Sequence, residues 1–359
     1  MLEINGVDER SVWGRFRMPV RPRLLDFRMH PQSDVVEQHS NEWVRSRLGS
    51  VFENTHSLDV FLRGRHGAWA GFAHPSADLA WATVVADVFQ FWFLLDDVVT
   101  YHRASEADGS GDFDGYSSLF DDLRSIMAGS PPRQHSVHTD AFRDLFDRAR
   151  TRLSAEQQHR FISYIEVMLD GFVDEIALRA CGGDLDFDGY MDLHRRSSGM
   201  DWVYLLVERG MDVDLSAARE SHPEIFTLHD VLTNTLIYGN DILGFRRDHV
   251  AGDQMNGVVV LMRHGMELQE AVNHVSALLL AGEREFVDLR AKILASELGK
   301  DPQISGYLAE LGQVLVGDQQ WHYVSPRYHG EQHEWNGVRW GYFELTRART
   351  YFVSADAPE

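Results

Sequence analysis

Apolar residues recur at three- and four-residue spacing through most of this 359-residue chain, while sustained period-two alternation is almost absent. The first pattern puts apolar side chains on one face of an α-helix, whereas the second is typical of a β-strand. The sequence therefore predicts an all-α fold. The periodic segments are residues 30–49, 74–97, 140–153, 156–180, 188–210, 228–250, 268–294 and 304–324.

No stretch of the chain has the composition of an interdomain linker, since its Gly- and Ser-rich segments are short and have helical patterns on both sides. The length alone would favour two domains, but length is only a soft guide. We therefore expect a single domain over residues 1–359, built around one large core. Residues 1–30 are expected to form an extended N-terminal arm, and residues 329–359 a C-terminal tail.

The chain carries 55 acidic and 34 basic residues, which gives a formal net charge of −21. This charge opposes binding to nucleic acid or to an anionic membrane surface, so an anionic substrate must be captured by local groups such as bound metal ions. The single cysteine, Cys181, excludes an intramolecular disulfide, and the first ten residues lack the apolar core of a signal peptide. We expect a cytoplasmic protein. The most apolar run, residues 84–99, contains three aspartates and a glutamine, so we expect no membrane anchor.

Two adjacent acids, Asp96 and Asp97, follow an aromatic helical segment. Phe93 precedes them by three and four residues, so its ring shares their helix face. Burying two ionised carboxylates without partners costs several kcal/mol. They are therefore either solvated at the end of the helix or bound to cations.

A second group, Asn240, Gly244 and Asp248, recurs every four residues along one helical face. Oxygen ligands on one face suit Mg²⁺, a hard cation whose coordination is often completed by water and phosphate oxygens. Arg246 and Arg247 lie in the same segment, and arginine is suited to bidentate recognition of phosphate. Taken alone, this pattern also fits an ordinary polar helix face.

Together these motifs resemble those of bacterial class I terpene synthases, also called terpene cyclases. Asp96-Asp97 resembles the aspartate-rich motif of that family, and residues 240–248 resemble its NDxxSxxxE metal motif. The resemblance implies a helical bundle around a central active-site cavity. It extends over nearly the whole chain, from the N-terminal FRMP and HP...NEW segments to an RY element near the C-terminus.

Two further elements carry the resemblance. Arg195-x-x-Ser198-Gly199 resembles the element that holds a diphosphate-sensing arginine, a linker residue and an effector glycine, and Arg195 lies 45 residues before Asn240. Trp321 with Arg327-Tyr328 resembles the C-terminal W...RY element.

The chain departs from the family pattern at four positions. Thr100 stands where a third acid is frequent, Gly244 replaces Ser or Thr, and Asp248 replaces Glu. His194 stands where an arginine is common.

The resemblance implies a role for each matched residue. Asp96, Asp97, Asn240, Gly244 and Asp248 are the expected ligand positions for three Mg²⁺ ions. The diphosphate is expected to bind to Arg195, Arg247, Arg327 and Tyr328. Ser198 and Gly199 would move a backbone carbonyl toward the carbocation.

A carbocation intermediate needs a dry pocket whose aromatic faces stabilise positive charge. Phe93 and Trp321 are the expected aromatic residues, with Phe89 and Tyr204 ranked after them. The favoured substrate is farnesyl diphosphate, followed by geranylgeranyl diphosphate. A homodimer is common among similar proteins.

Three other functions fit parts of the sequence. A chain-elongating prenyl diphosphate synthase shares the fold and the substrate class, but it typically has two aspartate-rich motifs, and here the second begins with Asn240. A helical metallophosphohydrolase is suggested by His229-Asp230. A single His-Asp sequence within a helix, however, usually packs in the core or faces solvent and binds no metal. A non-catalytic protein that binds a prenyl diphosphate is suggested by the missing third acid.

Overall fold

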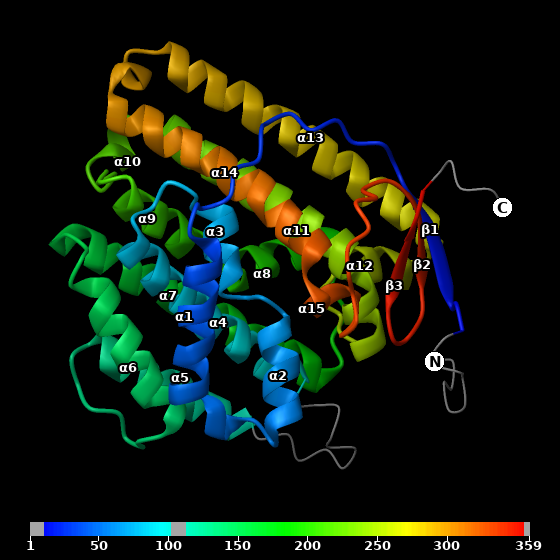
Figure 1. The fold of residues 1–359 in the computed structure, drawn as a ribbon, viewed down its shortest axis with the longest axis horizontal. Helices are drawn as coiled ribbons and strands as arrows, with labels where there is room; N and C mark the ends of the chain where they lie inside the picture. The colour runs from blue at the N-terminus through cyan, green and yellow to red at the C-terminus, as the bar shows by residue number, and fades with distance from the viewer. Residues whose placement is uncertain (1–10, 102–112, 355–359) are drawn as a thin grey trace.

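The computed structural model describes residues 11–101 and 113–354, and most of this part of the chain is helical (Figure 1). The prediction of a helical fold is confirmed. The α-helices are α1 (Ser33–Arg47), α2 (Thr55–Arg63), α3 (Ala68–Ala73), α4 (Leu79–Tyr101), α5 (Phe113–Met127), α6 (Val137–Arg150), α7 (Ala155–Cys181), α8 (Phe187–Ser197), α9 (Met200–Gly210), α10 (Ala218–Ser221), α11 (Pro223–Ala251), α12 (Gly257–Arg263), α13 (Leu268–Ala295), α14 (Pro302–Val324) and α15 (Pro326–His329). Short 3₁₀ turns span Gly49–Val51 and Leu298–Lys300.

Local signals fix the ends of the long helices. Ser154 caps α7 by accepting a hydrogen bond from the Gln157 backbone, and Gly182 ends this helix in a left-handed conformation with φ 63°. Helix α11 begins at Pro223 and ends at Gly252, which has φ 71°. Glycine adopts these positive φ values without the steric cost that a Cβ atom would add.

Helix α4 is the core helix that carries the first pair of acids. It is the one described helix long and apolar enough to cross a membrane, but 72% of its apolar window is buried inside the protein. It packs against α1, α3, α6 and α9. Asp87 lies within its buried part and accepts a 2.9 Å hydrogen bond from Arg148 of α6.

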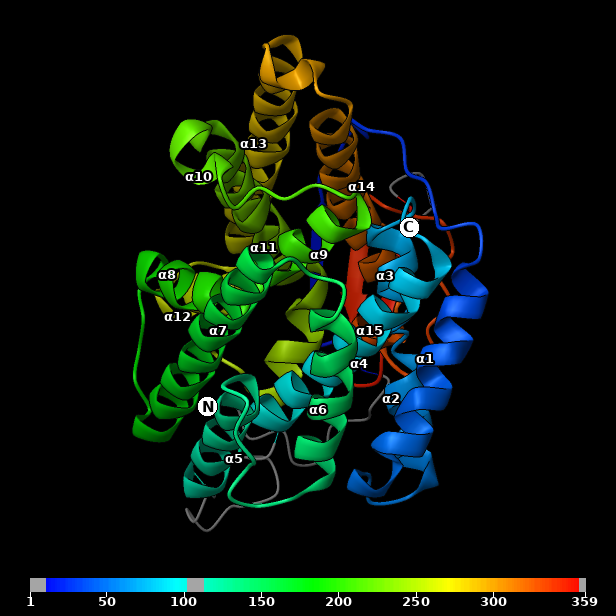
Figure 2. The same cartoon turned by 90° about the vertical axis from the view of Figure 1, so that its left-hand side faces the viewer.

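Helices α11, α13 and α14 form the other side of the bundle (Figure 2). Helix α11 packs against both α13 and α14, and α14 also packs against the short helix α3. The two helices that carry the acidic motifs, α4 and α11, thus have different principal neighbours, although α9 packs against both. The cavity described below is lined by residues of both.

Both ends of the described chain join in a small sheet, which the helical periodicity did not predict. Strands β1 (Gly14–Met18), β2 (Gly341–Leu345) and β3 (Thr350–Val353) are antiparallel in the order β1-β2-β3. Phe16 pairs with Phe343, which pairs with Phe352, and these rings pack in one cluster with residues of α13. The strands are only four or five residues long, which is too short to give a clear alternation in the sequence.

Between β1 and α1 the chain runs along α14. The Arg28 backbone donates to the Gln313 side chain at 2.8 Å, and the Gln313 amide donates to the Asp26 carbonyl at 3.0 Å. The His30 backbone then donates to the Gly71 carbonyl at 2.8 Å. These contacts fix the part of the expected N-terminal arm that the structure describes.

Candidate active site

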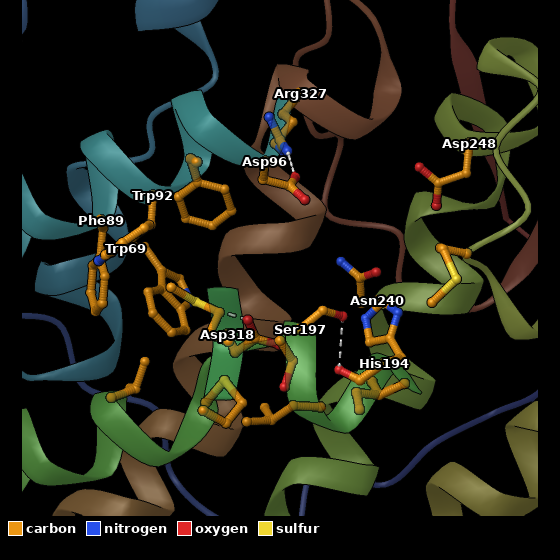
Figure 3. Close-up of a pocket in the computed structure, with 18 of the residues that line it drawn as sticks. Trp69, Phe89, Trp92, Asp96, His194, Ser197, Asn240, Asp248, Asp318 and Arg327 are labelled. Carbon is orange, nitrogen blue, oxygen red and sulfur yellow. Dashed lines mark hydrogen bonds and ion pairs between the residues drawn. The ribbon is translucent and has the colours of Figure 1, made fainter. Parts of the chain in front are cut away.

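A cavity with about 190 Å³ of free space lies among α3, α4, α7, α8, α9, α11, α14 and α15 (Figure 3). In Figure 3, Asp96, Arg327, Asn240 and Asp248 lie on one side, and aromatic rings lie on the other. The aromatic lining consists of Trp69, Phe89, Trp92, Phe93, Phe172, Trp202 and Trp321. A charged region and an apolar region therefore share one enclosed space.

Asp96 and Asp97 lie inside α4 rather than at its end, because the helix continues to Tyr101. The interpretation of the pair as a solvated helix terminus is therefore wrong. The side chains of Asp96 and Asp97 are 38% and 23% exposed, and both form ion pairs. Only Asp96 lines the cavity. The side chain of Thr100, at the position of the missing third acid, lies outside the described part of the structure.

Arg327 and Arg247 neutralise the two aspartates. Arg327 Nη2 donates to Asp96 Oδ2 at 2.8 Å and its Nη1 to Asp97 Oδ2 at 2.7 Å, while Arg247 Nη2 donates to Asp97 Oδ1 at 2.6 Å. The Arg327 guanidinium also lies 5.0 Å from the centre of the Phe93 ring. The predicted phosphate-binding arginines and the predicted metal-binding acids are thus direct partners.

The two carboxyl groups respond differently to this environment. Burial raises the pKa of Asp96 above its usual value, and the charges of Arg327 and Arg247 only partly offset this effect. Burial also acts to raise the pKa of Asp97, but the same two arginines outweigh it and the net pKa is lowered. Asp97 is therefore held as a carboxylate by its arginine partners.

The second predicted group lies on α11, and its three members face the same region. The Asn240 amide lies 3.1 Å from His322 Nε2 and 3.4 Å from the Tyr328 hydroxyl. A Cβ atom at Gly244 would lie 3.2 Å from Asp248 Oδ2 and 3.5 Å from the Tyr328 ring. The distance to the Tyr328 ring is an ordinary van der Waals contact, so a side chain at position 244 would be crowded mainly by the Asp248 carboxylate.

Asp248 is buried at the end of this group. Its Oδ2 accepts a 2.9 Å hydrogen bond from the Asn256 amide, and its Oδ1 lies 3.6 Å from Arg247 Nη1. Burial raises the pKa of Asp248 to about 6, against the lowering effect of Arg247. A cation in the cavity would favour the ionised form of this carboxyl.

The donor set suits a hard cation. Asp96, Asn240 and Asp248 all line the cavity, and their side chains offer carboxylate and amide oxygens, the ligands that Mg²⁺ prefers. Within the described residues, no group of three or more His, Cys, Asp or Glu side chains is arranged to hold a metal alone. Mg²⁺ is commonly bound by one or two carboxylates together with water and substrate phosphates, so these residues fit an ion that arrives with a phosphorylated ligand.

Comparison with known proteins identifies the family. Residues 87–285, more than half of the chain, match the model of terpene synthase family 2, C-terminal metal binding. The chain belongs to the terpene synthase family. Its acidic helices α4 and α11 both contribute residues to the matched region.

Relatives over most of the length are also terpene synthases. A (3S,6E)-nerolidol synthase from Selaginella moellendorffii is 24% identical over 88% of this chain and 84% of its own length. A germacrene A synthase from Nostoc punctiforme is 24% identical over 82% of this chain and 90% of its own. The crystal structure of linalool/nerolidol synthase from Streptomyces clavuligerus has a TM-score of 0.72 at 19% identity, covering 84% of this chain and 99% of that one.

The predicted sensor Arg195 does not reach the cavity of this terpene synthase. Its side chain is exposed, and its Nε lies 2.5 Å from the Asn234 oxygen. The preceding residue, His194, lines the cavity instead, and burial lowers its pKa to about 4. Successive residues of a helix point about 100° apart, so a one-residue difference in register separates a cavity residue from a surface residue.

The other two residues of this element, Ser198 and Gly199, lie at the junction of α8 and α9. Ser198 lines the cavity, and Gly199 has φ 69° at the break between α8 and α9. A Cβ atom at Gly199 would lie 2.3 Å from Trp202 Nε1 and 2.6 Å from Met168 Sδ. Both the backbone conformation and the close packing therefore require glycine here.

Arg246 has a structural position rather than the phosphate-binding one suggested by the sequence. Its Nε donates to the Tyr328 carbonyl at 3.1 Å and its Nη1 to the Arg347 carbonyl at 2.6 Å. This side chain joins α11 to α15 and to the C-terminal segment. Arg247, one residue later, points to Asp97 instead.

A basic residue that the sequence interpretation missed, Arg179 of α7, lines the cavity. Its Nη2 lies 3.0 Å from Glu175 and 3.0 Å from Asp253. Burial raises the pKa of Glu175 to about 7, partly offset by Arg179. None of the motifs considered in the sequence includes Arg179, Glu175 or Asp253.

Three of the four aromatic residues singled out in the sequence line the cavity. Phe93, Trp321 and Phe89 line the cavity, and the rings of Phe93 and Trp321 are 5.2 Å apart. Tyr204 does not line the cavity. It is buried in the core against His229, with its hydroxyl 2.9 Å from Thr233.

The buried position of His229 also removes the basis for the metallophosphohydrolase interpretation. His229 Nε2 lies 2.7 Å from the Tyr307 hydroxyl, whereas Asp230 is exposed. The two side chains therefore face different surroundings and do not form a metal-binding pair.

Proposed function

We propose that this terpene synthase ionises farnesyl diphosphate with the help of Mg²⁺ and directs the allylic cation to a cyclic terpene hydrocarbon or alcohol. The observation that carries the proposal is the division of one cavity into a side with carboxylates, an amide and arginines and a side with aromatic rings. A prenyl diphosphate has the same division, with an anionic head and a hydrocarbon tail. Linalool/nerolidol synthase, with the same fold, was crystallised in complex with 2-fluorogeranyl diphosphate.

Asp96, Asn240 and Asp248 would hold the metal, for which the resemblance implies three Mg²⁺ ions in all. When bound, Mg²⁺ stabilises the negative charge that develops on the departing diphosphate. Arg327 and Arg247 would bind phosphate oxygens, and their present contacts with the Asp96 and Asp97 carboxylates support this role. Diphosphate would take over contacts that the aspartates occupy in the free protein.

The aromatic side would protect and stabilise the cation. Aromatic faces attract a desolvated cation by roughly 2 kcal/mol or more each, and they offer no nucleophile that would end the reaction early. Phe93 lies next to the charged side, since the Arg327 guanidinium lies over its ring, and Trp321 packs against Phe93. Trp69, Trp92, Phe172 and Trp202 extend the aromatic wall from α3, α4, α7 and α9.

The test is incubation of the purified protein with geranyl, farnesyl or geranylgeranyl diphosphate plus Mg²⁺, followed by gas chromatography and mass spectrometry. We expect a cyclic product from farnesyl diphosphate and none without a divalent metal. Asn240→Ala is expected to abolish turnover, whereas Asn234→Ala, which removes an amide from the same helix outside the cavity, is expected to retain it. Longer diphosphates formed on adding isopentenyl diphosphate would instead identify a chain-elongating enzyme, and no turnover with any chain length would identify a non-catalytic binder.

A cytoplasmic location and a homodimer stay predictions of this proposal. Fractionation of cells and light scattering of the purified protein would test them separately from catalysis.

A further inference from the structure

We propose that His322 is a positioning residue, which Asp318 holds in one tautomer so that the Asn240 amide presents its oxygen to the cavity. This inference rests on the proposed function, because it assigns the Asn240 oxygen to a metal ion. It concerns two α14 residues that the sequence interpretation did not single out, and both line the cavity.

The contacts of His322 Nδ1 determine where its proton lies. Nδ1 is 2.9 Å from the Asp318 carbonyl oxygen and 3.3 Å from Asp318 Oδ2. Both neighbours are hydrogen-bond acceptors, so Nδ1 must carry the hydrogen and act as the donor. In the neutral imidazole, Nε2 is then an acceptor with a free lone pair.

The acceptor at Nε2 in turn determines the orientation of Asn240. An asparagine amide can turn by 180° and exchange its oxygen and nitrogen, so its surroundings must select one orientation. The Asn240 nitrogen lies 3.1 Å from His322 Nε2 and donates to it. The Asn240 oxygen therefore points away from His322, and in Figure 3 it lies on the Asp248 side of the amide.

This orientation matters because only the amide oxygen can bind a cation. The reversed amide would point N–H donors at the ion and remove one ligand. Partners that orient a metal ligand typically change metal affinity by 10- to 100-fold when they are lost. Tyr328 alone cannot select the orientation, since its hydroxyl, 3.4 Å from the Asn240 nitrogen, can donate as well as accept.

The positioning group is itself held firmly. The side chains of His322 and Asp318 are 4% and 8% exposed. Asp318 Oδ1 accepts a 3.1 Å hydrogen bond from Trp69 Nε1, which ties the group to α3 (Figure 3). The His322 ring stacks on Tyr328 with centroids 4.4 Å apart and planes 21° apart. Turning the imidazole over would break the contacts between its Nδ1 and Asp318.

Two substitutions of His322 separate the effect of its hydrogen-bond acceptor from the effect of its aromatic ring. His322→Phe keeps an aromatic ring to stack on Tyr328 but offers no acceptor, whereas His322→Gln loses the ring and keeps an acceptor oxygen. The readout is calorimetric titration of Mg²⁺ in the presence of inorganic diphosphate, with circular dichroism to verify folding. We expect metal affinity to fall 10- to 100-fold in His322→Phe and to stay near wild type in His322→Gln. Equal affinity in His322→Phe and wild type would overturn the inference, as would a larger loss in His322→Gln.

The Asn240→Asp background gives a second test, because a carboxylate presents an oxygen whichever way it turns. In that background, His322→Phe is expected to cause little further loss of metal affinity. A loss as large as in the wild-type background would show that His322 acts in some other way. Asn240→Ala separates the metal site from the role of His322. If Asn240→Ala leaves metal affinity unchanged, the proposed metal site is wrong. If Asn240→Ala lowers metal affinity and His322→Phe does not, only the role of His322 is wrong.

Discussion

Arg327 joins Asp96 to Asp97, with its Nη2 2.8 Å from an Asp96 oxygen and its Nη1 2.7 Å from an Asp97 oxygen. The contact connects α15, near the C-terminal end, to the acidic segment of α4, 231 residues earlier in the chain. Arg327 is only 5% exposed, so its planar guanidinium is fixed between the two carboxylates. A substrate that brings both cations and phosphates could replace each half of these ion pairs without leaving an unpaired buried charge.

The first prediction concerns the geometry of this contact. Arg327→Lys keeps the positive charge, but a single ammonium group cannot reproduce the two parallel hydrogen bonds of a guanidinium. We expect kcat for diphosphate release to fall by about 10² to 10³-fold, as for the loss of a donor that stabilises developing charge. Arg63→Lys, in an exposed pair with Glu331, is the matched control and should retain activity. Unchanged kcat in Arg327→Lys would remove Arg327 from the diphosphate site.

The second prediction replaces the sensor expected from the sequence with a residue found in the cavity. Arg195→Ala should leave turnover close to wild type, because this side chain is exposed and contacts Asn234. Arg179→Lys should reduce kcat/KM by about tenfold or more, since lysine cannot keep the contacts to both Glu175 and Asp253 and still face the cavity. Steady-state assays of the two variants are sufficient. The opposite ranking would restore Arg195 as the sensor.

A third prediction separates the effect of close packing at Gly199 on stability from the effect of its backbone strain. Gly199→Ala adds both a Cβ atom at φ 69° and an overlap with Trp202 and Met168, whereas Gly182→Ala adds a Cβ atom at φ 63° with no atom within 4 Å. The shared strain costs roughly 1–2 kcal/mol, and forcing extra atoms into a packed region typically costs a further 1–3 kcal/mol. Thermal unfolding should therefore show a larger loss for Gly199→Ala. Only Gly199→Ala should also change the product distribution. Equal losses would mean that the cavity wall moves freely at Gly199.

The fourth prediction follows from Asp241, a buried carboxyl on α11 that accepts a hydrogen bond from the Tyr190 hydroxyl. Burial raises its pKa from 3.8 to about 7, so the folded protein holds a proton that the unfolded chain releases. The resulting stabilisation is fully present below pH 4 and is lost as the pH rises through about 7. Asp241→Asn has no such proton. Between pH 5 and pH 8 the wild type should lose about 2 kcal/mol more unfolding free energy than this variant, as measured by urea denaturation without metal. Parallel pH profiles would contradict the assignment.

The long helices and the two acidic motifs could be predicted from the sequence because each depends on residues close together in the chain. The motif on α11 needs only a four-residue spacing, and Asp96 follows a long apolar segment of α4. The cavity wall could not be assembled in this way, because Trp69, Phe172 and Trp202 come from three different helices. Which face of each helix points into the cavity depends on how the helices pack against one another.

The error at Arg195 has a different cause. A motif match identifies a residue type at a spacing, and a shift of one residue near the break at Gly199 turns the side chain away from the cavity. The sheet was missed because its strands are short and its pairing joins residues more than 300 positions apart. No local pattern carries that information.

The pairing of β1 with β2 makes the two ends of the described chain neighbours, and β1 packs against α13. A force applied to either end of the described chain would therefore act first on the hydrogen bonds between β1 and β2. The same sheet continues through the Arg347 carbonyl to Arg246, and so to the α11 helix that carries Asn240. A change in this sheet would therefore reach α11, and with it the cavity, by two routes: through the Arg246 hydrogen bond and through Phe16, whose ring packs against Phe245 of α11.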